Sequence, residues 1–142
     1  MTWATDRLDA IKAGVSVPPV VATLQLGGLD EWGAKWVRKT WIPKPDLLNS
    51  DGSLFGGYVA ALADQMLAFA AMTVVPGDSL FRTINLSVNF VRIGRAAPLM
   101  IEARVVAVTK RLITVRVEFR RDDGDLIAEA TAQQIVEPFG RG

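Results

Sequence analysis

An apolar segment between Asp51 and Asp78 limits the possible folds of this chain more than any other part of the sequence. It contains one acidic or basic side chain, Asp64, which is followed directly by Gln65. The segment is too apolar for a surface helix, and its central polar pair and a Gly-Gly step interrupt it too much for a membrane span. The sequence therefore predicts a helix buried inside a soluble fold.

Helical periodicity divides this segment into a face of small side chains, which carries the carboxylate, and a face of large apolar ones. A lone carboxylate is costly to bury without a partner or a task. We therefore expect Asp64 either to do chemistry or to be a capped or Arg-paired structural group. The small face consists of Gly57, Ala60, Ala61, Asp64, Ala68 and Ala71, and the large face of Val59, Leu62, Met66 and Phe69.

Length and composition restrict the chemistry further. The 142 residues are enough for one domain spanning 1–142, and the net charge of +1 gives no reason to expect a nucleic acid or an anionic membrane as partner. The absence of His and Cys excludes Ser-His and Cys-His nucleophiles, disulfides and the usual zinc sites, so we expect no metal. Residues 1–8 resemble neither a secretory signal nor a lipidation site, which predicts a cytoplasmic protein.

Two further elements are predicted before the apolar segment. Residues 5–13 form a short amphipathic helix with Thr5 as its N-cap and Gly14 at its end. Residues 35–42 form a strand in which Trp alternates with Lys and Arg. This mixture could suggest a nucleic-acid surface, but the near-neutral charge favours packed Trp and solvated basic side chains.

Four strands are predicted after the apolar segment, over residues 83–90, 99–108, 113–120 and 126–136. Residues 83–90 alternate polar and apolar side chains throughout, as in a half-buried strand. We expect the four strands to form an antiparallel meander with the long helix across its apolar face. The predicted fold class is α+β, with one curled sheet wrapped round one helix.

Three spaced stretches carry a resemblance to a known family. They are Asn-Ser-Asp-Gly-Ser-Leu-Phe-Gly-Gly at 49–57, Leu-Ala-Asp at 62–64, and residues 83–95. Together they resemble the hotdog-fold acyl-CoA thioesterases of the phenylacetate-degradation (PaaI) type, over roughly residues 36–136. The resemblance implies a hotdog fold and thioester hydrolysis with no cofactor, coenzyme A being part of the substrate.

The resemblance also implies roles for four residues. Asp64 is the general base or nucleophile, and the Gly56 amide forms the oxyanion hole. Asn49 positions the attacking water or the thioester, and Thr83 holds that water or Asp64. In the family, Asn49 and the Gly56-Gly57 pair come from one subunit, and Asp64 and Thr83 come from the other, which implies a homodimer or homotetramer. Without the family, Asn49 would be a turn former and Thr83 an ordinary strand residue.

We expect Phe55, Gly57, Tyr58, Gln65 and Arg92 to contact the substrate, an aryl or medium-chain acyl-CoA. Phe55 occupies the position where many relatives carry His. It therefore supports an alternative, a hotdog module that binds acyl-CoA without hydrolysing it. A structural assembly protein, in which Asp64 only caps an interface, is a third hypothesis. The sequence does not distinguish aryl from aliphatic acyl groups, or nucleophilic from general-base catalysis.

Overall fold

The structure, a computed structural model, describes residues 1–140. It contains helices α1 (Trp3–Lys12), α2 (Pro19–Leu24) and α3 (Gly56–Met72), a 3-10 helix η1 (Pro45–Leu47), and strands β1 (Glu31–Gly33), β2 (Trp36–Trp41), β3 (Ser79–Phe90), β4 (Leu99–Val108), β5 (Leu112–Arg121) and β6 (Leu126–Pro138). Within the described residues, no helix is both long enough and apolar enough to cross a membrane.

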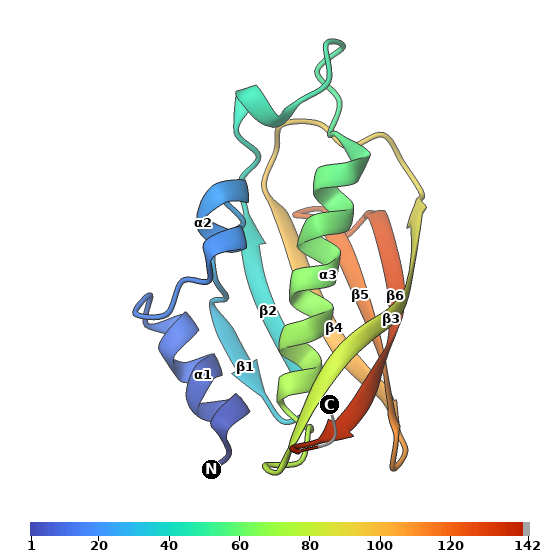
Figure 1. Cartoon of the computed structure of the whole chain (residues 1–142). Coiled ribbons are helices and arrows are strands. Elements are labelled where there is room, and N and C mark those ends of the chain that lie inside the picture. The colour runs from blue at the N-terminus through green and yellow to red at the C-terminus, as the bar shows by residue number, and fades with distance from the viewer. Residues whose placement is uncertain (141–142) are drawn as a thin grey trace.

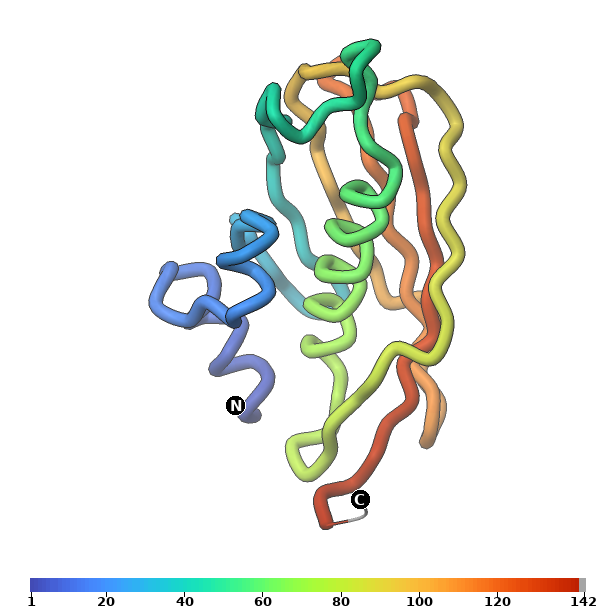
Figure 2. Tube along the Cα trace, turned by 45° about the horizontal axis from the view of Figure 1, so that its top comes forward, coloured from blue at the N-terminus to red at the C-terminus, as the bar shows by residue number. Residues whose placement is uncertain are grey.

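One antiparallel sheet in the order β1-β2-β4-β5-β6-β3 curves round the long helix α3. Figure 1 shows α3 lying across the sheet, with α1 and α2 beside the end formed by β1 and β2. Figure 2 shows the curvature of the sheet from a second direction. This arrangement matches the predicted α+β architecture of a curled sheet round one helix.

The strand order differs from the predicted meander. β4, β5 and β6 are consecutive neighbours, but β3 pairs with β6, and the neighbour of β4 on its other side is β2. The prediction that all four strands follow one another in the sheet is therefore wrong. The connection over residues 91–98 is long enough to cross the sheet, and it passes over the N-terminal end of α3 (Figure 1).

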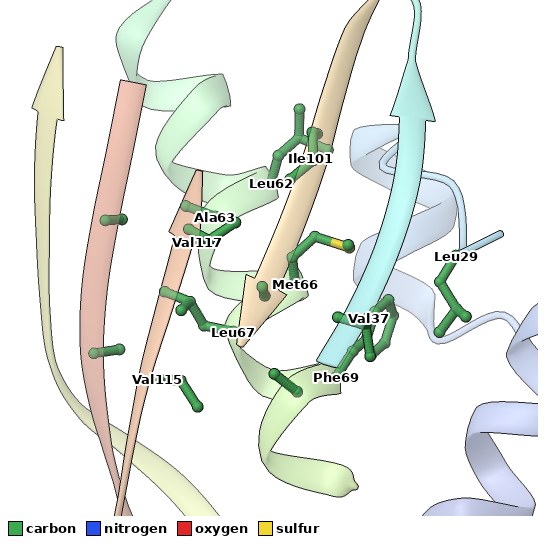
Figure 3. Packing of buried hydrophobic residues seen from close by; sticks show 14 of the residues in the cluster. Leu29, Val37, Leu62, Ala63, Met66, Leu67, Phe69, Ile101, Val115 and Val117 are labelled. Atoms are coloured by element: carbon green, nitrogen blue, oxygen red, sulfur yellow. The ribbon is translucent and has the colours of Figure 1, made fainter. Parts of the chain in front are cut away.

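The large face of α3 forms the centre of the core, as predicted. Leu62 and Met66 of this face are fully buried against the inner face of the sheet, and so is Leu67, which the prediction did not assign to either face. Figure 3 shows these side chains directed toward residues of β4 and β5 such as Ile101 and Val117. Each such buried side chain contributes roughly 1.5–3 kcal/mol to folding.

The small face of α3 is open in the single chain. Gly57 and Asp64 are exposed, and Ala60, Ala61 and Ala68 are only partly buried, whereas Ala71 near the end of the helix is fully buried. The expectation that Asp64 is buried is therefore wrong for the single chain. The reason is that α3 packs through its large face, while the opposite face carries too little side-chain bulk to attract another element of residues 1–140.

The first helix begins earlier than predicted. The Thr2 hydroxyl accepts from the Thr5 backbone N–H at 3.2 Å, and the Thr5 hydroxyl accepts from the Thr2 backbone N–H at 2.9 Å. This reciprocal capping box makes Thr2 the N-cap, so the assignment of that role to Thr5 is wrong. The helix ends before Gly14, whose positive φ of 75° fits the predicted stop. The sequence did not identify α2 as a helix.

A β-bulge changes which side chains of β3 face the helix. The register between β3 and β6 shifts between Thr83 and Asn85, which makes Ile84 an extra residue. One extra residue moves the two-residue alternation by one position. Thr83 before the bulge hydrogen-bonds to α3, and Val88 beyond it packs on the core. The prediction of strict alternation over 83–90, which would separate these two side chains, is therefore wrong.

Candidate active site

The N-terminal end of α3 presents free backbone amides. Phe55 is its N-cap residue and makes no side-chain capping bond, and the first amides with an acceptor are those of Tyr58 and Val59, both bonded to the Phe55 carbonyl. Within residues 1–140, the amides of Gly56 and Gly57 have no acceptor. The positive end of the helix dipole therefore carries two unpaired donors that can bind an oxyanion.

Aromatic rings lie close to both glycines. A Cβ at position 56 would lie 3.1 Å from the Phe90 ring, and a Cβ at position 57 would lie 2.8 Å from the Phe55 ring. Phe55 itself is 55% exposed. A side chain at position 57 would collide with the Phe55 ring and one at position 56 would crowd the Phe90 ring, so the two glycines allow these rings to pack against the helix start.

Asn49 lies in the loop that leads to this helix. Its Nδ2 donates to Ser53 Oγ at 3.0 Å and to the Leu54 carbonyl at 3.1 Å. Asp51 accepts from the Ser53 hydroxyl and backbone amide, and these hydrogen bonds hold the pKa of the Asp51 carboxyl below its usual value. Asn49 therefore helps to fix the loop before Gly56, in line with its turn-forming alternative.

Asp64 lies on the open face of α3, next to β3. Its Oδ1 accepts from the Thr83 hydroxyl at 3.2 Å, so the structure brings together two of the four proposed catalytic residues. Thr83 Oγ1 also lies 2.8 Å from Oε1 of Gln134 on β6. Gln134 is completely buried. The carboxylate, the hydroxyl and the amide form one polar chain from the surface of α3 into the sheet.

One chain does not bring the two halves of the proposed machinery together. Gly56 and Asp64 are eight residues apart on one helix, which corresponds to about 12 Å along its axis. A thioester oxygen on the Gly56 amide is therefore out of reach of the Asp64 carboxylate of the same chain.

A cavity of about 390 Å³ opens beside the start of α3. Its wall is mostly apolar and is formed by α3, the end of β3, the loop after β3, and the inner face of β4 to β6. Its lining residues are Ser53, Leu54, Gly56, Val59, Phe90, Val91, Arg92, Ile93, Gly94, Leu99, Phe119, Ile127 and Ala128. Arg92 is the cation among them, and its guanidinium donates to the Leu126 carbonyl at 2.7 Å.

Tyr58 and Gln65 do not line this cavity, and both side chains contact the segment after α2. The Tyr58 hydroxyl donates to the Gln25 carbonyl at 2.7 Å, its ring packs against Trp41, and burial raises its pKa. Gln65 Nε2 donates to the Gly27 carbonyl at 2.7 Å. Both side chains therefore attach the segment after α2 to the long helix.

Lys39 is a buried cation that is hydrogen-bonded to Gln65. Its ammonium donates to the Leu26 carbonyl at 2.8 Å and to Gln65 Oε1 at 2.7 Å, and only 4% of the residue is exposed. Burial lowers the pKa of Lys39 from 10.5 to about 8, and the negative charge of Asp30 opposes this shift. Because the charged form is disfavoured in the folded state, the unfolded chain binds more protons at alkaline pH.

The lowered pKa of Lys39 links folding to proton release, so the titration of Lys39 should raise the stability of the protein as the pH rises. Stability increases between the folded pKa of about 8 and the unfolded value of 10.5. From pH 7 to pH 9.5, the free energy of unfolding should rise by roughly 2 kcal/mol more in the native protein than in a Lys39→Met variant. Urea unfolding at several pH values measures this difference, since all other groups titrate in both proteins. If the free energy of unfolding changed with pH by the same amount in both proteins, the prediction would be wrong.

The sequence reasoning missed Gln134 and the cavity. A signal for Gln134 exists, because Ala128, Ala130 and Ala132 alternate along β6 as a buried apolar stripe, and Gln134 is the next member. The cavity could not be found in this way, since it depends on the crossing of the loop after β3. Within the described residues, no group of three or more His, Cys, Asp or Glu side chains could hold a metal ion.

The architecture and the comparisons define the class of this protein. A curled antiparallel sheet round one long helix is a hotdog fold, and solved thioesterase structures share it. A sequence model of the thioesterase superfamily matches residues 51–128. The chain belongs to this superfamily and is a thioester hydrolase.

Several solved structures resemble the chain along most of its length. A phenylacetic acid degradation-related protein from Ralstonia eutropha JMP134 is 25% identical, with a TM-score of 0.78 over 90% of this chain and 98% of that one. A thioesterase from Haemophilus influenzae is 16% identical, with a TM-score of 0.81 over 94% and 92% of the two chains. A hypothetical thioesterase from Streptococcus pneumoniae, solved with coenzyme A, is 21% identical, with a TM-score of 0.70 over 78% and 84%. No curated protein sequence matches this chain.

Proposed function

We propose that this protein is an acyl-CoA thioesterase of the PaaI type, with each active site built from two subunits. The observation that carries the proposal is the separation, along the single helix α3, of two groups with complementary roles. Its start offers free amides at Gly56, and its middle offers Asp64 held by Thr83. Coenzyme A in the related Streptococcus pneumoniae structure supports an acyl-CoA substrate.

The chemistry divides between the half-sites. The Gly56 amide of one subunit polarises the thioester carbonyl and stabilises the oxyanion formed on attack. Asp64 of the partner subunit either removes a proton from the attacking water or attacks the carbonyl carbon itself. In the general-base route, collapse of the tetrahedral intermediate breaks the carbon–sulfur bond, releases coenzyme A as the thiol and leaves the oxygen of the water in the product acid. In the nucleophilic route, collapse releases the same thiol and leaves a mixed anhydride of the acyl group with Asp64, which water then hydrolyses to the free acid and the Asp64 carboxylate.

The uncovered surface of the chain supports a homodimer as the minimal unit. β3 is an edge strand, and it exposes apolar side chains such as Ile84 and Phe90, at 53% and 57%. An exposed apolar edge strand is a template for pairing with another chain. Pairing β3 with its symmetry mate would also cover the small face of α3, next to which β3 lies.

The cavity beside Gly56 supports an acyl group of limited size. Its volume of about 390 Å³ lies at the lower end of the range for small-molecule sites, and its wall is mostly apolar. An aryl ring or a medium aliphatic chain fits this description better than a long chain. Arg92 at this cavity is the candidate contact for a polar or anionic part of the substrate.

Thiol release from a panel of aryl and aliphatic acyl-CoA thioesters tests the proposal. We expect turnover that is fastest for aryl or medium-chain substrates and falls for long chains. Saturable binding of acyl-CoA without thiol release would instead support the non-catalytic module. The feature in favour of that alternative is Phe55, an apolar and exposed ring where many relatives carry His.

A further inference from the structure

Gln134 is a polar side chain in an apolar part of the core. It lies directly opposite Thr83 across the β3–β6 pair, and none of its surface is exposed. The other inward positions of β6 near it, Ala132 and Val136, are apolar and buried. A buried amide costs about 1–3 kcal/mol unless it is hydrogen-bonded, so stability alone would favour an apolar residue at this position.

The hydrogen bonds around Thr83 contain a conflict. Its hydroxyl lies within bonding distance of two acceptors, Gln134 Oε1 at 2.8 Å and Asp64 Oδ1 at 3.2 Å. A hydroxyl has a single proton and can donate fully to only one of them. In the same arrangement, Gln134 Nε2 is buried with no partner within residues 1–140. Either Asp64 Oδ1 or Gln134 Oε1 therefore lacks the Thr83 proton, while the donor Gln134 Nε2 lacks an acceptor.

Half a turn of the terminal amide resolves the conflict. The nitrogen and oxygen of a Gln side chain are equal in shape, and the hydrogen-bond network decides their orientation. In the turned orientation, Gln134 Nε2 donates to Thr83 Oγ1, and the Thr83 proton is available for Asp64 Oδ1. The unpaired atom is then the Gln134 carbonyl oxygen, and an under-satisfied buried carbonyl is less rare than an orphaned N–H.

We propose that Gln134 is a positioning residue that makes Thr83 a dedicated donor to Asp64. This role rests on the proposed thioesterase function. Asp64 is exposed, so its carboxylate would otherwise rotate freely. A donor fixed at Oδ1 holds one oxygen against β3 and leaves the other oxygen facing the open side of α3. A carboxylate held in this way is oriented before water or substrate arrives, which reduces the entropic cost of the reaction.

A double-mutant cycle tests whether Gln134 acts through Thr83. We expect Gln134→Met and Thr83→Val each to lower kcat by about 10-fold with a smaller change in KM, because both disturb the same donor. The double variant should be no slower than the slower single variant, and Thr83→Ser should keep most of the activity. The matched control is Gln133→Met, since the neighbouring side chain points to the other face of β6 and bonds to Asn85.

If the loss of kcat in the double variant equals the product of the two single losses, at matched folding and oligomeric state, Gln134 does not act through Thr83. This result would overturn the proposal and leave Gln134 a structural residue. If the native protein releases no thiol from any acyl-CoA, the proposed function fails instead, and a second measurement decides the hydrogen bond. We expect one ¹⁵N-bound side-chain proton of Gln134 to move upfield in Thr83→Val but not in Thr83→Ser, because only Val removes its acceptor. Unchanged amide shifts in Thr83→Val would contradict the proposed donation.

Discussion

Replacing Asp64 by Asn should lower kcat for thioester hydrolysis by two or more orders of magnitude, roughly the effect of losing a general base or nucleophile. The substitution keeps the size of the side chain and its ability to accept from Thr83 Oγ1, but it removes the negative charge. Because Asp64 is exposed in the single chain and makes no contact in the hydrophobic core, we expect little change in the thermal stability of the fold. Release of free thiol from the preferred acyl-CoA measures the effect.

The matched control makes the same chemical change away from the helix. Asp122 is exposed in the turn between β5 and β6, so Asp122→Asn should retain native turnover. If Asp64→Asn keeps more than about a tenth of the native kcat, Asp64 is neither base nor nucleophile. For the native enzyme, single turnover in ¹⁸O-labelled water separates the two routes. Label appears in the Asp64 carboxylate when Asp64 is the nucleophile and water cleaves the anhydride at the Asp64 carbonyl carbon, whereas general-base catalysis places the label in the product acid alone.

The sequence was sufficient for the parts of the fold that depend on local periodicity. The large face of α3 is buried and the strand over residues 99–108 has its predicted bounds, because alternation and helical period follow directly from burial on one side. The position of β3 at the edge was not predictable in this way. Several strand orders satisfy the same alternation, and the choice depends on how the connection over residues 91–98 crosses the sheet.

The candidate site, like the fold, could be predicted from the sequence only in part. Asp64 stands out from the sequence because it is the single acidic or basic residue in an apolar segment, and the structure places it against Thr83. This contact depends on the bulge at Ile84, which no local pattern indicated, since residues 83–90 alternate without interruption. Gln134 was missed for a related reason, because its importance depends on its register opposite Thr83 and not on its neighbours along the chain.

The Gly56 amide is expected to be as important as Asp64, and one substitution can remove its N–H while keeping the helix. Gly56 is the first residue of α3, where proline is tolerated because the N–H has no helical acceptor. Phe55 has φ −71° and ψ 118°, an extended conformation that suits a residue before proline. The nearest atom to an added Cβ is at the end of the Phe90 ring, 3.1 Å away. We expect Gly56→Pro to fold and to lose at least 100-fold in kcat, as for other lost oxyanion donors.

Mixing the two inactive variants tests the shared site directly. In a heterodimer of Asp64→Asn and Gly56→Pro, one site combines the native Gly56 of the first chain with the native Asp64 of the second, and the other site carries both changes. Random exchange in an equal mixture makes half of the dimers heterodimers, so about a quarter of the native activity should return. Each variant alone, taken through the same unfolding and refolding, is the control. If native mass spectrometry shows mixed dimers and the activity stays at the level of the single variants, both groups act within one subunit and the two-subunit mechanism is wrong.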